Sequence, residues 1–440
     1  MASGAGFIWN EPAETMDREA LRTLQGERLR ALAGYVYERS PFYRARFDEY
    51  GVAPDSIRDL GDLGNLPFTV KGDLRDHYPF GMLAVPREEV VRVQASSGTR
   101  GKLTVVGYTQ RDVETWAEVC ARALALGGTK PGDVVQNAYG YGLFTGGLGI
   151  HYGAERMGAT VIPMSGGNTV RQVGILKDLR ATTLTCTPSY ALIIGEIMER
   201  EGVFPGDLDL RFGIFGAEPW TEEMRLEIER RLDIHAVDIY GLSEVIGPGV
   251  ACECVEARDG LHVQEDHFLI EVVNPNTGES LPDGHYGELV FTTLTKEAMP
   301  VIRYRTGDIS AIIDEPCICG RTTRRMARLR GRFDDMIILH GVNVYPSEIE
   351  AALLEFSEVA PFYQIVLDWN GRTETIEVQA EMTPHYTAEA IAEDKAVLTQ
   401  QIARILKSRF DLTMQVQLFA PGELGRLEVG KAVRVVDRRK

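Results

Sequence analysis

The fold of this chain is most restricted by an alternation of strand-like and helix-like segments between about residues 88 and 240. Short runs rich in β-branched residues, such as DVVQNA, TTLTCT and RFGIFG, are separated by longer amphipathic stretches, such as QRDVETWAEVCARALALGG and TEEMRLEIERRL. Strands that alternate with helices are typical of an α/β fold, in which successive strands run parallel. The series begins with VVRVQ and LTVVGYT. We therefore predict an α/β fold with mixed, largely parallel sheets.

Three other regions have different patterns. Residues from about 15 to 50 repeat apolar positions every three to four residues, which predicts helix. From about 262 to 313, strand-like runs follow each other closely, with turns such as NPNTGE and LPDGHYGE between them, which favours an antiparallel, barrel-like subdomain. After about residue 334, the segments predict a smaller α+β unit. A chain of 440 residues has room for two or three domains.

The charge of the chain limits its partners. Lys and Arg number 47 against 64 Asp and Glu, a formal net charge of −17, which argues against a general nucleic-acid or anionic-membrane surface. No run approaches the ~18 apolar residues of a membrane helix, and no secretory signal is seen. We expect a cytoplasmic protein that binds neither nucleic acid nor a membrane. Two basic stretches, at 100–102 and at 321–332 (RTTRRMARLRGR), either hold an anionic small molecule or are solvated surface charges.

The stretch SSGTRGKLT, from Ser96 to Thr104, combines hydroxyls, glycines and basic side chains directly before a β-branched run. Glycine allows the backbone to approach a ligand closely, and hydroxyls, amide N–H groups and lysine are good donors to phosphate oxygens. The stretch is not a Walker A loop, because Gly98 and Gly101 are too close together and Leu103 follows the lysine. By itself, it indicates a phosphate-binding loop no better than it indicates an exposed turn.

Further motifs accompany this loop in a fixed order along the chain. They are GAEPWTEEMR from Gly216, YGLSE from Tyr240, FTTLTKEAMPVIRYRTGD ending at Asp308, GRFDDMIILHGVNVYP from Gly331 and GKAVRVVDRR from Gly430. Together with SSGTRGK, this series resembles the adenylate-forming superfamily of acyl-CoA synthetases, adenylation domains and luciferases. Longer stretches, among them NAYGYGLFTGGLGIHYGAERMGATVIPMSGGNTVRQ, resemble the phenylacetate-CoA ligase subfamily. The resemblance extends from about residue 7 to the end of the chain.

The resemblance implies an ATP-dependent ligase with two half-reactions. A carboxylate attacks the α-phosphorus of ATP to give an acyl-adenylate and pyrophosphate, and the acyl group then passes to the thiol of coenzyme A. The resemblance also implies a large N-terminal domain, residues 1–333, that binds ATP and the acid, and a small mobile C-terminal lid domain, residues 334–440, that carries a catalytic lysine. An aryl or arylacetic acid fits best, with phenylacetate as the first candidate. Members of the subfamily are often dimers, so a homodimer is expected.

The resemblance assigns residues to the nucleotide site by position. Glu244 would hold Mg²⁺, which prefers carboxylate and phosphate oxygens; the alternative is a carboxylate at a helix N-terminus capped by Ser243. Asp308 would accept hydrogen bonds from the ribose hydroxyls, and the alternative is an ordinary turn aspartate. Arg332 would contact the nucleotide just before a hinge at Asp334. The phosphates would be bound by Ser96, Ser97, Gly98, Thr99 and Lys102, and the adenine and its surroundings by Gly216, Ala217, Glu218, Asp238, Tyr240, Gly241 and Ser243.

Lys431, with Glu244 and Arg332, completes the catalytic group that the resemblance implies. In the family, the lysine of this motif bridges the substrate carboxylate and the α-phosphate during adenylation. Without the motif, a lysine so near the C-terminus would be interpreted as an exposed tail residue. Rotation of the C-terminal domain about Asp334 would then withdraw Lys431 and open a pantetheine tunnel. Residues of AYGYGLFTGG would form the acyl pocket, with Trp220 nearby, unless they are plain core residues. The pocket residues are Tyr139, Tyr141, Phe144 and Gly146.

Four of the six cysteines form two C-x-C pairs. Cys252 and Cys254 are one pair, Cys317 and Cys319 the other, and His262 lies between them in sequence. Zinc takes four Cys or His ligands in a tetrahedron, and the alternative is a group of reduced thiols packed close together. Some members of the subfamily have a structural zinc held by three cysteines and a histidine. The matching set is Cys254, His262, Cys317 and Cys319, with Cys252 as the alternative to Cys254.

Two other functions remain open at this point. The first is an adenylating enzyme that passes the acyl group to a carrier protein or another nucleophile. The second is a nucleotide-binding sensor that has lost catalytic activity. Turnover with free coenzyme A separates the first from a CoA ligase, and the presence of Lys431, Glu244 and Asp308 argues against the second. Gln264 stands where the subfamily often has tryptophan, and we expect this departure to reshape the region near the cysteines. It also leaves the exact acid open.

Overall fold

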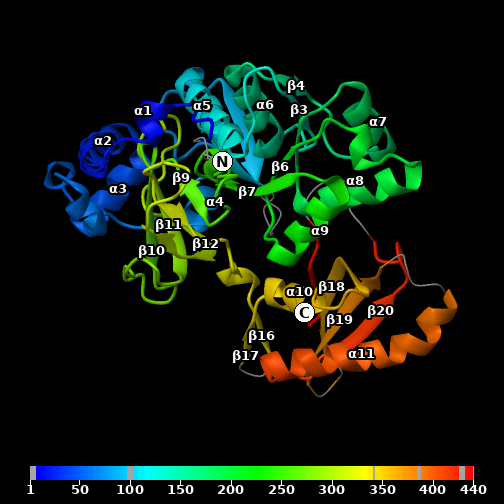
Figure 1. Cartoon of the computed structure of the whole chain (residues 1–440). Helices are drawn as coiled ribbons and strands as arrows, with labels where there is room; N and C mark the ends of the chain where they lie inside the picture. The colour runs from blue at the N-terminus through cyan, green and yellow to red at the C-terminus, as the bar shows by residue number, and fades with distance from the viewer. Residues whose placement is uncertain are drawn as a thin grey trace.

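The chain folds into two parts, which Figure 1 shows as a large part coloured from blue to yellow and a smaller part, coloured from yellow-orange to red, below it. The computed structural model describes residues 6–96, 103–339, 342–369, 371, 373–383, 388–425 and 432–439. One cluster of buried apolar residues draws its members only from the smaller part, from Ile337 to Leu418. The smaller part therefore has a core of its own.

A mixed nine-stranded sheet forms the centre of the large part. The strands from β4 to β7 pair in parallel, and the strands from β8 to β13 continue the sheet in antiparallel order. This arrangement confirms the predicted α/β fold with mixed sheets. In spatial order the strands are β4 (Thr160–Ile162), β3 (Val134–Asn137), β5 (Thr183–Cys186), β6 (Phe212–Gly216), β7 (His235–Leu242), β8 (Gly247–Glu253), β9 (Leu261–Val263), β14 (Arg325–Met326) and β13 (Ile312–Ile313).

Helices connect the parallel strands, as the alternation predicted. Three of them begin at a threonine whose hydroxyl accepts a hydrogen bond from the backbone N–H three residues later: Thr109, Thr187 and Thr221. Such caps satisfy an N–H group that has no partner within the helix, and so fix where the helix starts. The helices of this region are α5 (Gln110–Leu126), α6 (Thr145–Met157), α7 (Thr169–Asp178), α8 (Pro188–Glu201) and α9 (Glu222–Leu232).

The first two strand-like runs do not join the parallel sheet. β1 (Arg92–Ser96) and β2 (Thr104–Tyr108) pair only with each other among the described residues, as a two-stranded antiparallel sheet. A parallel connection needs a crossover of about a dozen residues or more, and only seven residues separate Ser96 from Thr104. The prediction that VVRVQ and LTVVGYT belong to the parallel alternation was therefore wrong.

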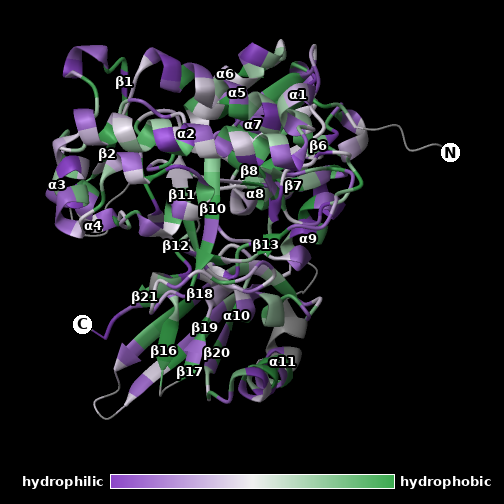
Figure 2. Ribbon diagram, turned by 90° about the vertical axis from the view of Figure 1, so that its left-hand side faces the viewer, coloured by the Kyte–Doolittle hydropathy of each residue, from purple (hydrophilic) through white to green (hydrophobic). Residues whose placement is uncertain are grey.

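A second sheet, four-stranded and antiparallel, occupies most of the region predicted to be barrel-like. Its order is β10 (Phe268–Val273), β11 (Gly287–Thr293), β12 (Tyr304–Ser310) and β15 (Gly331–Arg332). The strands β9 and β13, which the prediction placed in the same subdomain, extend the nine-stranded sheet instead. Figure 2 shows that hydrophobic residues predominate along β10, whereas α2 at the surface has hydrophilic and hydrophobic residues in turn.

The N-terminal segment is helical, as its periodicity predicted. It forms α2 (Arg18–Arg39) and α3 (Pro41–Tyr50), and the break between them falls at a proline, which begins a new helix because it has no N–H to continue the old one. The short elements of the large part are α1 (Glu11–Glu14), α4 (Lys71–Asp76) and the 3-10 helices η1 (Pro54–Ser56), η2 (Leu60–Asn65), η3 (Arg87–Glu89), η4 (Pro205–Asp207) and η5 (Phe333–Asp335).

The smaller part is the predicted α+β unit. A four-stranded sheet in the order β20-β19-β18-β21 carries it, and β16 and β17 form a separate hairpin. Ala360 and Phe362 on β18 are buried in a cluster that otherwise consists of residues from the large part, including Leu192 of α8 and Met224 of α9. The two parts therefore share an apolar seam. The elements are β16 (Ile337–Leu339), β17 (Val342–Val344), α10 (Pro346–Leu353), β18 (Val359–Trp369), β19 (Glu374–Met382), α11 (Ala388–Phe410), β20 (Gln415–Phe419) and β21 (Val435–Asp437).

Candidate active site

A cavity of about 210 Å³ opens at the carboxyl ends of β6 and β7, above the seam with the smaller part. Ligands of α/β proteins bind at this end of a parallel sheet, where the loops after neighbouring strands converge. Other parts of its wall come from α4, the end of β1, the start of α6, β8, β9, β14 and the β12–β15 pair. The predicted residues that line it are Ser96, Tyr139, Phe144, Gly146, Ala217, Glu218, Trp220, Asp238, Tyr240, Gly241, Ser243, Glu244, Asp308 and Arg332.

Glu244 lies at the wall of the cavity with its carboxylate directed to two residues from distant segments. The hydroxyl of Ser96 donates to Oε1 at 3.2 Å, and Nζ of Lys71 lies 3.8 Å from the same oxygen. Lys71 is a lining residue that the motifs did not indicate. From the other side, the buried Lys296 donates to the main-chain carbonyl of Glu244 at 3.1 Å, and burial lowers the pKa of this lysine to about 8. The metal-binding candidate is thus held at both its side chain and its backbone.

Asp308 is bound by two neighbours that also face the cavity. The hydroxyl of Tyr240 donates to Oδ2 at 2.6 Å, and Nη1 of Arg332 lies 3.3 Å from Oδ1. Asp308 and Arg332 face each other across the β12–β15 ladder, which is why two motifs 24 residues apart meet here. Burial and the adjacent carboxylate raise the pKa of Tyr240 well above its usual value, so its hydroxyl stays protonated. A carboxylate has about four acceptor positions, which suits this side chain to more than one hydrogen-bond donor at a time.

The indole of Trp220 forms part of the cavity wall and is fixed by two arginines. The guanidinium carbons of Arg225 and Arg328 lie 5.2 and 5.3 Å from its ring centroid. Arg225 is itself buried, and its Nη2 donates to both carboxylate oxygens of Glu253, at 2.9 and 2.7 Å. Burial and the same Glu253 carboxylate raise the pKa of Asp238, which lies beside them in the cavity wall. This part of the wall therefore combines an aromatic ring with charged side chains.

The arginines of the basic run at 321–332 fall into two groups, one that forms ion pairs within the protein and one that lines the cavity. Arg321, Arg324 and Arg325 pair with Glu14, Glu265 and Asp259, at 2.5, 2.8 and 2.9 Å. Arg328 and Arg332 instead line the cavity. The interpretation as solvated surface charges does not fit Arg321 and Arg325, because both are buried and paired with the protein's own acids. The binding of an anion by the two arginines that face the cavity stays a prediction.

Three of the four residues predicted for the acyl pocket line the cavity, namely Tyr139, Phe144 and Gly146. A Cβ on Gly146 would approach the Phe144 ring to 2.6 Å, so glycine permits the ring to sit there. Tyr141 is not among the described lining residues. Its hydroxyl accepts from Nδ2 of Asn137 at 2.8 Å and lies 3.2 Å from Nδ1 of His151. The assignment of Tyr141 to the acyl pocket therefore stays a prediction, whereas its three companions line the cavity.

Gly216, which was assigned to the adenine surroundings, is also not among the described lining residues. It ends β6, and a Cβ there would lie 2.1 Å from the carbonyl oxygen of Ile239 on β7. Glycine at this position lets two parallel strands pack, while the following residues of the motif line the cavity. Other lining residues had no recognised motif role: Thr145, Ile239, Leu242, Pro248, Leu261, Tyr304, Thr306, Met326 and Leu329.

Several assigned residues lie outside the described part of the chain. These are Ser97, Gly98, Thr99 and Lys102 of the loop after β1, and Lys431. The backbone of Asp334 is described within η5, but its side chain is not. Ala432, which follows Lys431 in sequence, donates its backbone N–H to Oε2 of Glu218 at 3.0 Å.

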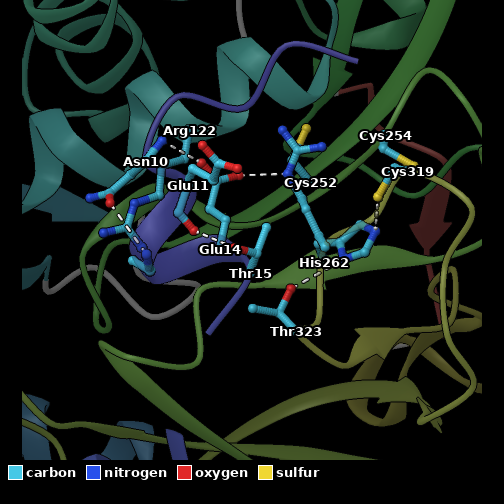
Figure 3. A network of polar contacts seen from close by, with 12 residues as sticks. Asn10, Glu11, Glu14, Thr15, Arg122, Cys252, Cys254, His262, Cys319 and Thr323 are labelled. Atoms are coloured by element: carbon cyan, nitrogen blue, oxygen red, sulfur yellow. Dashed lines mark hydrogen bonds and ion pairs between the residues drawn. The ribbon is translucent and has the colours of Figure 1, made fainter. Parts of the chain in front are cut away.

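A second polar site lies at the far end of β8. Cys254, His262, Cys317 and Cys319 bring their ligand atoms within 4.8 Å of one another. The Sγ atoms of Cys254 and Cys317 are 3.6 Å apart, and Sγ of Cys319 is 3.3 Å from Nε2 of His262. Figure 3 shows this imidazole between Cys319 and the hydroxyl of Thr323, which is 3.1 Å from Nδ1.

Cys252 does not join this group. It lies two residues earlier on β8, and its thiol donates to the carbonyl of Ala123 at 3.5 Å. The choice that the sequence left open is therefore decided in favour of Cys254 as the cluster member. Gln264, the other departure noted in this region, is buried and accepts from Nη1 of Arg122 at 3.3 Å.

Comparison with known proteins identifies the class. The family model of AMP-binding enzymes matches residues 55–294, and that of the AMP-binding enzyme C-terminal domain matches residues 341–439. The chain therefore belongs to the AMP-binding, adenylate-forming enzymes. No helix in the described ranges is long and apolar enough to cross a membrane.

Within this class, the chain is similar over nearly its whole length to phenylacetate-coenzyme A ligases. It is 53% identical to that of Thermus thermophilus, across 99% of this chain and 100% of the relative. It is 51% identical to that of Aromatoleum evansii and 50% identical to that of Escherichia coli, across 98% of this chain and 97% of each relative.

Solved structures of a related ligase in two states show which arrangement of the two parts this chain adopts. The chain superposes on 2-hydroxyisobutyryl-CoA ligase in the postadenylation state with a TM-score of 0.92 and 28% identity, covering 100% of this chain and 94% of that one. The same ligase in the thioesterification state, with 2-HIB-AMP and CoA, gives 0.73 at 29% identity, covering 98% and 93%. The relative position of the two parts therefore follows the first state and not the second.

Proposed function

We propose that this chain is an ATP-dependent aryl- or arylacetyl-CoA ligase that acts on phenylacetate or a close relative. The observation that carries the proposal is the identity of 50–53% with phenylacetate-coenzyme A ligases over 98–99% of the chain. The cavity agrees with this chemistry, because it combines an apolar, aromatic wall with carboxylates and arginines. The products are acyl-AMP and pyrophosphate in the first half-reaction, then acyl-CoA and AMP in the second.

The residues of the cavity divide the first half-reaction between them. Attack of a carboxylate on the α-phosphorus brings anions together, so the site must supply positive charge and hydrogen-bond donors. We assign ribose binding to Asp308 and a contact with the nucleotide phosphate to Arg332. Glu244 would hold Mg²⁺, and its carboxylate beside the Ser96 hydroxyl fits the oxygen ligands that this ion prefers. Bound Mg²⁺ would neutralise phosphate charge.

The smaller part acts in this proposal as the lid, with its boundary at residue 334 and Lys431 as the residue that enters the site for adenylation. The support is the docked position of Ala432 against Glu218, since it brings the segment after Lys431 to the cavity wall. The second half-reaction requires the lid to leave this position. The homodimer and the cytoplasmic location expected from the sequence stay predictions, and sedimentation tests the first of them.

The cysteine cluster would hold a structural zinc ion. A tetrahedron with Zn–S bonds of about 2.3 Å has ligand atoms about 3.8 Å apart, and the 3.6 and 3.3 Å separations are close to this edge. They are also far longer than a disulfide bond of about 2.05 Å. The Thr323 hydroxyl beside Nδ1 would orient the imidazole. With four protein ligands no position is left for water, so the role is structural and not catalytic.

Pyrophosphate release with ATP and Mg²⁺, measured over a panel of carboxylic acids with and without coenzyme A, tests the proposal. Phenylacetate or a substituted relative should give sustained turnover only when coenzyme A is present. An acid that forms adenylate while coenzyme A has no effect would instead point to a carrier protein or another nucleophile as acceptor. If no aryl acid gave pyrophosphate release, the assigned substrate class would be rejected.

A further inference from the structure

The loop from Ala217 to Thr221, between β6 and α9, faces the cavity on one side and the smaller part on the other. Four of its residues, from Ala217 to Trp220, line the cavity. Ala217 has a φ of +73°, a left-handed conformation that is unfavourable for a residue with a side chain and is held only where the surroundings impose it. The loop is thus fixed in an unusual shape at the junction of the nucleotide cavity and the smaller part.

Glu218 spans this junction with its two carboxylate oxygens. Oε1 accepts from the backbone N–H of Ser189 in the first turn of α8, at 2.8 Å. A helix N-terminus favours a negative charge through its free N–H groups and its dipole. Oε2 accepts from the backbone N–H of Ala432, at 3.0 Å. One carboxylate therefore joins a fixed helix of the large part to a backbone N–H of the smaller part.

Ala432 contacts the large part, whereas the residues that follow it in sequence are bonded to the smaller part. Directly after it, the backbone is held by the smaller part: Gln364 donates to the carbonyl of Val433 at 3.2 Å, and the N–H of Ile365 donates to that of Arg434 at 2.8 Å. β21 then pairs with β18. Lys431 precedes Ala432 in sequence, so it immediately adjoins the residue that Glu218 binds.

A second contact from the same loop supports the first. The hydroxyl of Thr221 donates to Oε1 of the buried Glu350 on α10, at 3.3 Å. Nη2 of Arg434 lies 3.6 Å from the other oxygen of Glu350, and its guanidinium stacks on the Tyr363 ring at 4.4 Å from the centroid. The loop thus contacts the smaller part at its helix α10 and next to its last strand, β21.

We infer that Glu218 is a positioning residue that docks the segment after Lys431 onto the nucleotide cavity, and so favours the adenylating arrangement of the lid. Because Glu218 also lines the cavity, a bound nucleotide that contacts this loop stabilises the docked lid, and the bond must break before the thioester-forming arrangement is reached. This inference rests on the proposed function and deepens it: Glu218 acts through the lysine segment, not only on the adenine.

The test separates the two half-reactions in Glu218→Gln and Glu218→Ala. Adenylation is measured as pyrophosphate release from ATP and phenylacetate, and thioester formation as acyl transfer from preformed phenylacetyl-adenylate to coenzyme A. Loss of a hydrogen bond to a charged group predicts a fall of about ten- to hundredfold in adenylation rate, with thioester formation within about threefold of wild type. Glu114→Gln removes an exposed carboxylate on α5, far from the seam, and is the matched control.

Two results would overturn the inference. An equal loss in both half-reactions would reduce Glu218 to a structural residue. A loss explained entirely by weaker ATP binding in calorimetry would make it a nucleotide ligand only. Amide hydrogen exchange of the peptide containing Ala432, with ATP bound, gives a readout that does not depend on turnover. Faster exchange there in Glu218→Ala is expected, and unchanged exchange refutes the docking. If wild type activates no aryl acid, the proposed function fails while the exchange result still decides the docking.

Discussion

Asp308→Asn should weaken ATP binding through the ribose and leave the shape of the site intact. Asparagine keeps the volume of the side chain but removes the charge and replaces one acceptor oxygen with a donor. The side chain of Asp308 is only 9% exposed, so its hydrogen bonds are well shielded from water. A hydrogen bond to a charged acceptor contributes about 1.5–3 kcal/mol, which predicts an increase of about ten- to hundredfold in the Kd for ATP.

The assay is calorimetric titration of wild type and Asp308→Asn with ATP, 2′-deoxy-ATP and 3′-deoxy-ATP. If Asp308 binds the diol, wild type should lose affinity for the deoxy nucleotides, while the variant, which has already lost the interaction, should lose little more. This non-additivity distinguishes a direct contact from a general disturbance of the cavity. Additive losses, or a Kd for ATP within about twofold of wild type, would refute the assignment of Asp308 to the ribose.

Three further predictions concern other parts of the molecule. Lys431→Ala should lower adenylate formation by about 10²-fold or more and spare thioester formation from preformed adenylate; equal losses in stopped assays of both steps would contradict its role. Cys317→Ser should lose zinc in elemental analysis and about 4 kcal/mol of unfolding free energy in denaturant titration, whereas Cys252→Ser should keep its metal. Burial lowers the pKa of His267 to about 4. Because the unfolded imidazole already binds a proton near pH 6.5, the free energy of unfolding should decrease by on the order of 2–3 kcal/mol as the pH is lowered from 6.5 to 4. In urea titrations, His267→Gln should show a weaker dependence on pH over this range.

The regular elements of the parallel half were predictable because each is signalled locally. β-Branched runs, amphipathic periods and threonine caps such as Thr187 and Thr221 are all visible within a few residues of sequence. The direction in which strands pair is not signalled in this way, which is why the β1–β2 hairpin was assigned to the parallel series. The length of its connection was the one available clue. Likewise, nothing local indicates that β9 and β13 extend the large sheet and not the small one.

The site was predictable where a motif carries its residues together, and not where only tertiary structure unites them. Tyr240 and Glu244 share one motif, and Asp308 and Arg332 come from two that pair across adjacent strands. Lys71 lies about 170 residues before Glu244 in sequence and belongs to a short helix with no distinctive pattern, so its approach to 3.8 Å comes entirely from the fold. The docking of Ala432 on Glu218 likewise joins residues 214 positions apart.

The separateness of the β1–β2 hairpin bears on how such a protein can diverge. The hairpin shares no ladder with the nine-stranded sheet among the described strands, so the two sheets have no ladder hydrogen bond in common. A change of length or charge in the stretch between its strands, which has an arginine at position 100, should therefore leave the ladder of the nine-stranded sheet unbroken. Residues such as Gly216, whose strand packs directly on its neighbour, have no such freedom. New catalytic properties should thus arise at the hairpin sooner than at the sheet.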